Sequence, residues 1–242
     1  MRPRDTADLA GSAGLGAWAA FAVLGLVVGG HGTPLSVDGT LLSWSLDHRP
    51  AVAVAVARGL TATGTGVIPY LLVALAGLAV GRTARQRAVA AALGLGCLAA
   101  GQALRYGVME LISRPRPPRQ DWAAHASAWS FPSGHTTTSA LTAGLLILAT
   151  AVRAPRGRRA LCIVVGCWGA LVGLTRVYLG VHWFTDMIGG WLFAAGWLGV
   201  CLCAATWWLP AGLVSELTAR AGGPVEDHAG QGPGGRGRSH PV

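Results

Sequence analysis

Six long apolar runs constrain the fold of this chain more than any other feature. They lie at about residues 13–30, 64–81, 88–112, 135–152, 160–179 and 187–209. A helix needs about 20 predominantly apolar residues to cross the hydrocarbon core of a bilayer. In lipid, a helix also satisfies its backbone polar groups within one segment. The runs therefore predict one all-α membrane domain, residues 13–209, built as a bundle of six transmembrane helices.

The composition argues against a soluble protein. Only 12% of the 242 residues are charged and 52% are hydrophobic, whereas a soluble domain carries about 25% charged residues. The net charge of +9 and the pI near 10.6 would suit a nucleic-acid partner. However, all 19 basic residues are arginines that cluster at the ends of apolar runs, as expected for charges that orient membrane helices. We therefore expect a lipid bilayer, and no nucleic acid, as the partner.

The arginines also predict which end of the bundle faces the cytoplasm. Twelve of the 19 lie in the N-terminal segment 1–12, the loops 81–87 and 153–159, and the tail 210–242. The positive-inside rule places these segments in the cytoplasm, and the Gly, Pro and charge content of the tail predicts disorder. The remaining loops then face the extracellular or periplasmic side of the cell membrane. A signal peptide is the competing interpretation of the first run, but no convincing small-residue cleavage site follows it.

Residues 31–66 are too mixed in polarity to form a span of their own. Their leucines and Trp44 indicate an amphipathic piece, and the apolar segment 51–57 is too short to cross. We expect one or two short interfacial helices on the outer face here. Four polar residues of this segment are expected to be solvated loop residues without a role: His31, Asp38, Asp47 and His48.

A small polar turn precedes the fourth run and carries the first chemical signal. It reads Pro132-Ser133-Gly134-His135. Serine is a favourable helix N-cap, and a helix N-terminus attracts anions through its backbone N–H groups and its dipole. A histidine beside a serine hydroxyl in such a turn suggests phosphate binding with a proton donor at hand.

A second signal lies between the fifth and sixth runs. His182 and Asp186 are four residues apart, a spacing that places both on one face of a helix. A carboxylate there can hold one imidazole nitrogen and leave the other to attack, although an Asp at a helix start also simply favours the dipole. Arg176 ends the fifth run before a turn at Gly180. The planar guanidinium group of Arg176 suits a phosphate. Alternatively, this arginine only anchors the helix end at the membrane interface.

A third signal, Arg114-Pro115-Arg116-Pro117, follows the third run. Each proline favours extended geometry in the residue before it, which keeps two guanidinium groups on a stiff segment. A solvated basic loop explains this stretch equally well when it is taken alone. Together, the three signals place two imidazoles, a carboxylate and several arginines at one membrane face. Phosphoryl transfer through a phosphohistidine requires such a set of groups.

These residues make the chain resemble the type 2 phosphatidic acid phosphatase (PAP2) family, which shares its site with vanadium haloperoxidases. The family's signatures are Lys-x6-Arg-Pro, Pro-Ser-Gly-His and Ser-Arg-x5-His-x3-Asp. The second is complete at residues 132–135, and the third is present with Thr175 in place of the serine. In the first, residues 116–117 fit, but Met109 occupies the position of the lysine. Arg105, one helical turn earlier, is the candidate to supply the missing charge.

The resemblance implies a role for each matched residue. His182 would be the nucleophile, Asp186 would orient it, and His135 would be the general acid for the leaving group. The phosphate-binding residues would be Arg116, Ser133, Gly134 and Arg176, with Arg105 as a weaker candidate. The resemblance implies no metal and no other cofactor. It implies a lipid phosphate or diphosphate as substrate, such as a polyprenyl diphosphate, phosphatidate or phosphatidylglycerol phosphate. His125, nearby in sequence, is expected to be an ordinary loop residue.

Two other functions stay open on the sequence. A non-catalytic lipid-binding or transport protein would explain the missing lysine, and a vanadate-dependent haloperoxidase would use the same pocket. The intact His135, His182 and Asp186 argue against the first, and the six apolar runs argue against the second, whose relatives are soluble. Neither the individual lipid nor the oligomeric state follows from the sequence.

Overall fold

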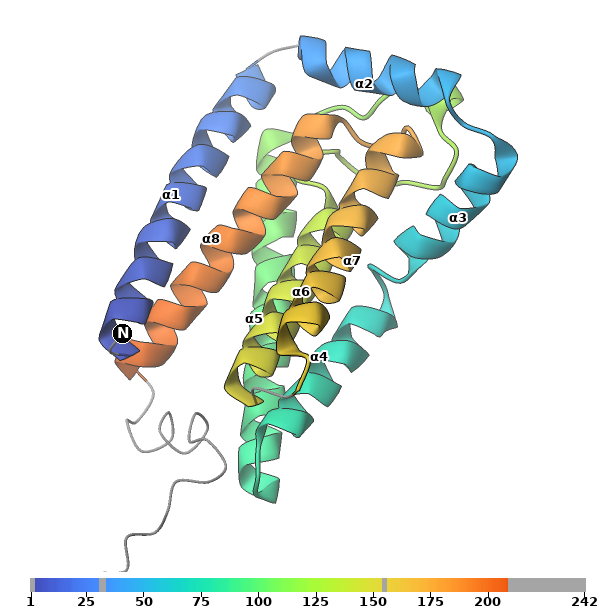
Figure 1. Ribbon diagram of the computed structural model, residues 1–242. Helices are drawn as coiled ribbons and strands as arrows, with labels where there is room; N and C mark the ends of the chain where they lie inside the picture. Colours follow the sequence, from blue (N-terminus) through green and yellow to red (C-terminus); the bar gives the residue numbers. More distant parts are fainter. Residues whose placement is uncertain (1–2, 31–33, 154–155, 209–242) are drawn as a thin grey trace, which may run out of the picture.

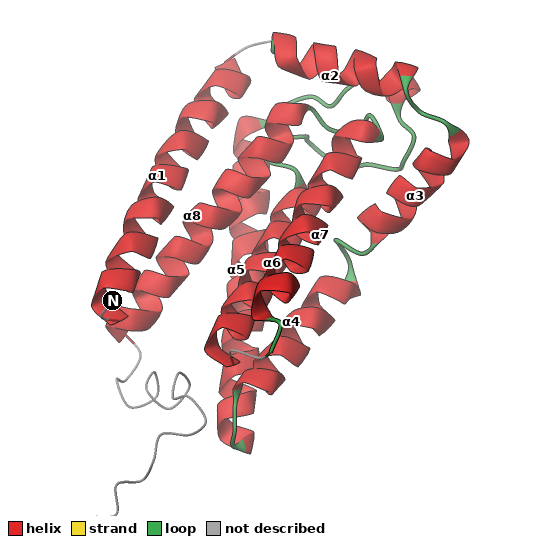
Figure 2. Ribbon diagram, viewed as in Figure 1, coloured by secondary structure: helices red, strands yellow, loops and turns green. Residues whose placement is uncertain are grey.

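The chain folds into a bundle of long helices (Figure 1). The computed structural model describes residues 3–30, 34–153 and 156–208. Its α-helices are α1 (Pro3–Gly30), α2 (Ser36–Asp47), α3 (Ala51–Ala62), α4 (Val67–Val80), α5 (Ala84–Ile112), α6 (Gly134–Arg153), α7 (Arg158–Tyr178) and α8 (Phe184–Trp208). A short 3-10 helix, η1 (Arg119–Asp121), lies between α5 and α6. The prediction of an all-α membrane bundle is confirmed (Figure 2). His31 and the tail predicted to be disordered lie outside the described residues.

Five of the described helices are long and apolar enough to cross a membrane by themselves. They are α1 from Gly11 onward, α5, α6, α7 and α8. A sixth crossing needs α3 and α4 together, which are bent by 50° at the break between them. The α4 helix alone has 14 residues, whereas a span needs about 20.

The break between α3 and α4 makes the second span differ from the expectation of a single helix over 64–81. Gly66, at the break, has a φ of 66°, a left-handed conformation that glycine adopts without strain and that interrupts a helix. The segment 51–57, expected to be interfacial, belongs to α3, a helix of 12 residues that is too short to cross a membrane alone.

The bundle has two distinct ends. The α1 helix packs along α8, while α6 contacts both α7 and α8. The α2 helix lies across the end of the bundle where the loops with the predicted motifs gather (Figures 1 and 2). The end of α4 and the starts of α5 and α7, which flank the arginine-rich loops, lie at the opposite end (Figure 1). The motif loops and the basic loops are therefore separated by the length of the bundle.

An aromatic cluster fixes the chain just before the Pro-Ser-Gly-His turn. Phe131 is fully buried and stacks on Phe21 of α1 with ring centroids 5.5 Å apart. Phe193 of α8 and Trp18 of α1 complete the cluster. Because lipid tails are as apolar as these rings, van der Waals packing holds the cluster more than a hydrophobic driving force does. The cluster therefore fixes the start of α6 against α1 and α8.

The end of α7 turns by a Schellman motif, which brings His182 back towards the helix it follows. Gly180 donates its N–H to Val177 and Val181 donates to Arg176, at 2.9 and 3.2 Å, the bond pattern of that motif. Gly180 has a φ of 69°, and a Cβ there would overlap the carbonyl oxygen of Asp121. Only glycine suits this turn, so the turn predicted at Gly180 directly sets the position of His182.

Candidate active site

The three predicted stretches meet at one cavity of about 380 Å³ at the α2 end of the bundle. Six of the eight predicted site residues line it: Arg105, Arg116, Gly134, His135, Arg176 and His182. The other two, Ser133 and Asp186, are fully buried behind its wall. A second cavity of about 550 Å³ adjoins the first, because Thr65, His125, His135 and Arg176 line both. His125, expected to be an ordinary loop residue, therefore also borders the site.

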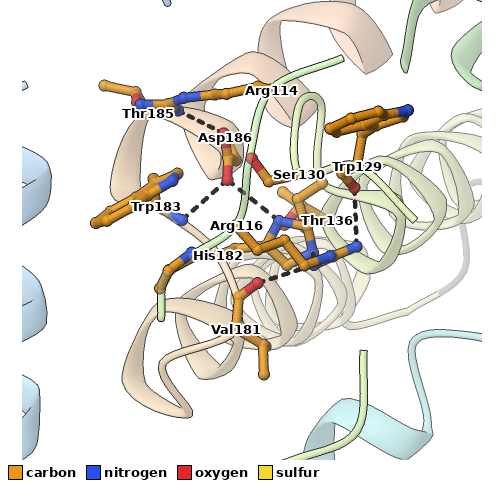
Figure 3. A network of polar contacts seen from close by, with 12 residues as sticks. Arg114, Arg116, Trp129, Ser130, Thr136, Val181, His182, Trp183, Thr185 and Asp186 are labelled. Atoms are coloured by element: carbon orange, nitrogen blue, oxygen red, sulfur yellow. Dashed lines mark hydrogen bonds and ion pairs between the residues drawn. The ribbon is translucent and has the colours of Figure 1, made fainter. Parts of the chain in front are cut away.

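His182 and Asp186 form a buried pair at the start of α8 (Figure 3). The Nδ1 atom of His182 lies 3.3 Å from Oδ2 of Asp186. The same carboxylate oxygen accepts the backbone N–H of Trp183 at 2.9 Å. The carboxylate lies in the first turn of the helix and the imidazole in the loop just before it. The two side chains therefore meet, but not on one face of a helix as the four-residue spacing predicted. The pair is therefore held by the helix start itself.

The contact with Arg116 determines which ring nitrogen of His182 carries the proton. Its Nη1 atom lies 2.8 Å from Nε2 of His182. A guanidinium group has only donors, so Nε2 must accept with its lone pair, and Nδ1–H points to Asp186. Burial, followed by the positive charges of Arg116 and Arg176, holds the pKa of His182 well below its usual value. The imidazole is therefore neutral near pH 7, with its basic nitrogen at the cavity.

Backbone carbonyls hold the Arg116 side chain in this position. Nη1 donates to Val181 O at 2.8 Å, and Nη2 donates to Ser127 O at 2.7 Å and Trp129 O at 2.9 Å. Nε donates to Ala128 O at 2.9 Å. Three carbonyl groups of the loop between α5 and α6 thus accept hydrogen bonds from one guanidinium group, and Figure 3 shows its bonds to Trp129 and Val181. Its position is preorganised, and the stiff Arg-Pro segment expected from the sequence explains how it reaches the cavity.

The Pro-Ser-Gly-His turn enters α6 at the cavity wall. Ser133 donates its backbone N–H to Asp186 O at 3.1 Å, which ties the start of α6 to the start of α8. Its hydroxyl accepts from Thr136 Oγ1 at 3.0 Å. At Gly134, a Cβ would lie 3.4 Å from the Cζ and Nη1 atoms of Arg105. The Arg105 guanidinium group therefore lies directly beside the N-terminus of α6.

Arg176 lines the cavity with an incomplete set of hydrogen bonds. Its side chain is only 2% exposed. Nη1 and Nη2 reach Thr61 Oγ1 and His125 O at 3.4 Å each, which are long for such bonds. Its buried Nε has no hydrogen-bond partner among the described residues. A buried, under-bonded guanidinium group at a cavity is suited to an anionic ligand.

Arg105 lies beside Met109, the residue at the lysine position of the first signature, and both line the cavity. Its Nη1 atom is 3.4 Å from the sulfur of Met109, the residue at the lysine position. Its guanidinium group stacks over Tyr106 at 3.9 Å from the ring centroid, and Nε donates to Gln102 at 3.1 Å. The side chain is 4% exposed. The positive charge of Arg105 thus lies at the cavity beside Met109, although Arg105 comes one helical turn earlier in the sequence.

The expectation that Asp38 is a solvated residue is wrong. Asp38 is 1% exposed on α2 and pairs with Arg114, which in turn pairs with Asp186. An Asp in the first turn of a short helix is common enough that the sequence carried no sign of this contact. Asp47 and His48 are exposed at the other end of α2, as expected. Asp38 thus lies beside the site although no motif indicated it, and Arg114, part of the Arg-Pro-Arg-Pro signal but without a predicted role, connects it to Asp186.

No cluster of three or more His, Cys, Asp or Glu side chains that would suit a metal ion occurs within residues 3–30, 34–153 and 156–208. The residues that line the cavity include three arginines and three histidines, and no aspartate or glutamate. This donor set suits an anion held by charge-assisted hydrogen bonds.

The sequence matches the family model of the PAP2 superfamily over residues 89–210. It is 38% identical over 86 residues to phosphatidylglycerophosphatase B of Bacillus subtilis, covering 34% of this chain and 41% of that protein. It is 38% identical over 96 residues to lipid A 1-phosphatase of Rhizobium etli, covering 40% and 37%. The chain thus spans about two fifths of the length of these two relatives. It is 33% identical over 150 residues to decaprenylphosphoryl-5-phosphoribose phosphatase of Mycobacterium tuberculosis, covering 60% and 76%.

A solved structure is similar over most of the chain. It is the crystal structure of a transmembrane PAP2-type phosphatidylglycerolphosphate phosphatase from Bacillus subtilis. The TM-score is 0.65 at 25% sequence identity, with 79% of this chain and 92% of that chain covered. The match extends the similarity beyond the family-model region to most of the helical bundle.

Proposed function

Because this chain belongs to the PAP2 superfamily, we propose that it is a membrane phosphatase acting on a lipid phosphate or diphosphate through a phosphohistidine. It is a multi-pass membrane protein. One observation carries the proposal: the basic Nε2 of His182 meets a cavity lined by three arginines and two further histidines, one of them His135. A nucleophile, cationic groups for the phosphate and a proton donor are thus placed around one space.

In the first step, Nε2 of His182 attacks the phosphorus atom and the bond to the leaving oxygen breaks. Arg116 shifts its contact from Nε2 to the phosphate oxygens, and Arg105 and Arg176 hold the others. These cations stabilise the charge on the equatorial oxygens in the transition state. Asp186 stabilises the imidazolium that forms on His182, through Nδ1–H. The negative charge of the bound phosphate favours the protonated form of His135. His135 then donates its proton to the leaving oxygen, so the lipid alcohol or lipid phosphate leaves with that oxygen protonated.

In the second step, a water molecule attacks the phosphorus atom of the phosphohistidine. His135, now neutral, takes a proton from the water as the P–O bond forms. The bond between phosphorus and Nε2 breaks, and inorganic phosphate leaves. His182 returns to the neutral form in which it began, and His135 carries the proton for the next cycle. The same two histidines therefore serve both steps, as microscopic reversibility requires.

A lipid substrate fits the surroundings of the cavity. Tyr70 of α4 and Tyr106 of α5 line it, and both side chains are also exposed on the surface of the bundle. We infer that the acyl or prenyl chain lies beside these helices while the phosphate enters among the arginines. Polyprenyl diphosphate, phosphatidate and phosphatidylglycerol phosphate all meet this description. The arginine-rich loops at the far end of the bundle support a cavity that faces the extracellular or periplasmic side.

Phosphate release tests the proposal. Purified protein in detergent would receive each of the three lipids in the presence of excess chelator. We expect release that persists in chelator and falls by about a thousandfold or more in His182→Ala, because the nucleophile is lost. His48→Ala, an exposed histidine of the same end of the bundle, is the matched control and should keep full activity. Activity retained in His182→Ala, or activity abolished by chelator in the wild type, would contradict the proposed mechanism.

The same panel separates the transport hypothesis from the phosphatase. A lipid-binding or transport protein would release no phosphate from any of the lipids. It would also tolerate His182→Ala, since binding needs no nucleophile.

A further inference from the structure

Asp38 of α2 is a buried carboxylate that the reaction scheme above does not use. It is 1% exposed and lies outside the family-matched residues 89–210. Oδ1 accepts the backbone N–H of Thr185 at 2.9 Å, and Oδ2 accepts the Thr185 hydroxyl at 2.8 Å. Oδ2 also accepts Nη2 of Arg114 at 2.7 Å. Every one of these bonds leads to a residue beside Asp186.

Arg114 connects the two carboxylates. Its Nη2 atom binds Asp38, while its Nη1 atom lies 2.5 Å from Oδ1 of Asp186. Nη1 also donates to the Thr185 hydroxyl at 2.8 Å. Arg114 is 5% exposed, so these charges are removed from bulk solvent. Figure 3 shows Arg114 and Thr185 on one side of Asp186, with His182 and Trp183 on the other.

Arg114 and His182 compete for the carboxylate group of Asp186. Its contact with Arg114 is 2.5 Å, whereas its contact with Nδ1 of His182 is 3.3 Å. A guanidinium group without a second partner tends to place both amino groups on one carboxylate. Asp38 occupies Nη2 and so limits Arg114 to a single oxygen of Asp186. The other oxygen stays available to His182.

We propose that Asp38 is a positioning residue that acts through Arg114 and Thr185 to hold Asp186 against His182. It touches no reacting atom. The inference rests on the proposed function, and it makes α2, the helix across the end of the bundle, part of the catalytic unit. Without Asp38, Arg114 would turn its full charge and both amino groups towards Asp186. The carboxylate would then move from His182, and the imidazole would lose its fixed tautomer.

The test is a double-mutant cycle on phosphate release. Asp38→Asn keeps the shape of the side chain and removes its charge. We expect kcat to fall by about 10–100-fold, by analogy with the loss of a partner that orients a metal-binding side chain. KM should change less than about threefold, since the cavity arginines stay in place. In the Asp186→Asn background the same substitution should cost less than about threefold, because its route to His182 is already broken. Asp47→Asn, exposed on the same helix, is the control and should leave kcat unchanged.

Equal losses in both backgrounds would overturn the proposal, since Asp38 would then act independently of Asp186. A raised KM at unchanged kcat would also overturn it, because the effect would lie in phosphate binding. Should Asp38→Asn fail to fold, Thr185→Val removes one link alone. We expect a several-fold fall in kcat for Thr185→Val that disappears in the Asp186→Asn background, and an unchanged kcat would refute the inference.

Nitrogen NMR of histidine-labelled protein gives a readout that needs no turnover. His182→Ala identifies the His182 signals. We expect wild-type His182 as the single Nδ1–H tautomer and Asp38→Asn with mixed tautomers. An unchanged His182 spectrum in Asp38→Asn would overturn the positioning role. A wild-type protein that releases no phosphate would instead refute the proposed phosphatase, and the spectrum would still decide the role of Asp38.

Discussion

At the scale of single residues, the site depends on how His182 is held. Asp186 binds its Nδ1–H and Arg116 binds its Nε2, so the two neighbours together select the tautomer with a basic nitrogen at the cavity. The four-residue spacing made the first contact predictable. The second contact was not, because Arg116 reaches His182 only through a loop whose carbonyls wrap its guanidinium group.

The pH dependence of kcat/KM should report this arrangement. Burial and nearby cations lower the pKa of His182, and the neutral form is the nucleophile. Activity should therefore persist below the ordinary histidine pKa of about 6.5 and be lost only as the pH falls through the lowered value. Arg116→Gln removes one of those cations, so its acid limb should move to higher pH even though its activity is lower. An acid limb that stays in place, or moves to lower pH, would contradict the assignment.

Arg105 offers an exchange test of the first signature. We expect Arg105→Ala to lower kcat/KM by about 100–1,000-fold, the range for loss of one preorganised group that stabilises transition-state charge. Adding Met109→Lys to that variant should restore much of the activity, because a lysine there places a charge on the same wall of the cavity. Phosphate release by the two variants measures both effects. Full activity in Arg105→Ala would show that this guanidinium group plays no part.

At the scale of elements, glycines set how closely the helices approach. A Cβ at Gly77 of α4 would overlap the backbone of α5 at Ala91, whereas Gly96 of α5 has nothing within 4 Å of the same position. The lengths of the apolar runs predicted the membrane helices themselves. The facing pairs, however, depend on helix rotation, which the sequence did not define.

Gly77→Ala should therefore destabilise the bundle, and Gly96→Ala should not. In both variants alanine favours the helix over glycine by about 1 kcal/mol. The difference in stability between the two variants therefore reports the contact between α4 and α5. We expect the Gly77 variant to lose about 1–3 kcal/mol, typical of overpacking, seen as a lower thermal unfolding midpoint in detergent. Equal midpoints for the two variants would mean that α4 and α5 are not in such close contact.

The elements also show where reasoning from sequence was incomplete. The sequence predicted one continuous helix over 64–81, whereas the structure has a bend before a shorter helix, α4. The reason is that Gly66 interrupts the helix. Asp38 was missed for a different reason. Its partners lie on other elements, 76 residues away at Arg114 and 147 residues away at Thr185, and no local pattern indicates such a contact.

At the scale of the whole molecule, the candidate active site and the arginine-rich loops lie at opposite ends of the bundle. The cavity and α2 lie at one end of the bundle, and the ends of the helices that flank the arginine-rich loops lie at the other (Figure 1). Charge placement along the sequence predicted this separation. Positive charge near the cytoplasmic face is favoured during insertion, which supports an outward-facing cavity.

Cysteine labelling in intact cells tests that orientation. Asp47→Cys places an exposed thiol on α2, and Arg156→Cys places one beside the start of α7 at the opposite end. A membrane-impermeant maleimide should label the first in intact cells and the second only after permeabilisation. Wild-type protein, with its five native cysteines, is the control for background labelling. The reverse pattern would place the cavity on the cytoplasmic side.

Capture of the covalent phosphohistidine is the decisive measurement. His135→Ala would be mixed with radioactive p-nitrophenyl phosphate, whose leaving group needs no proton donor, and quenched in alkali. The missing base should slow attack by water, so label should accumulate on the peptide that contains His182. The doubly substituted protein, with His182→Ala as well, should carry none. Label on another residue, or continued turnover by His182→Ala, would show that His182 is not the nucleophile.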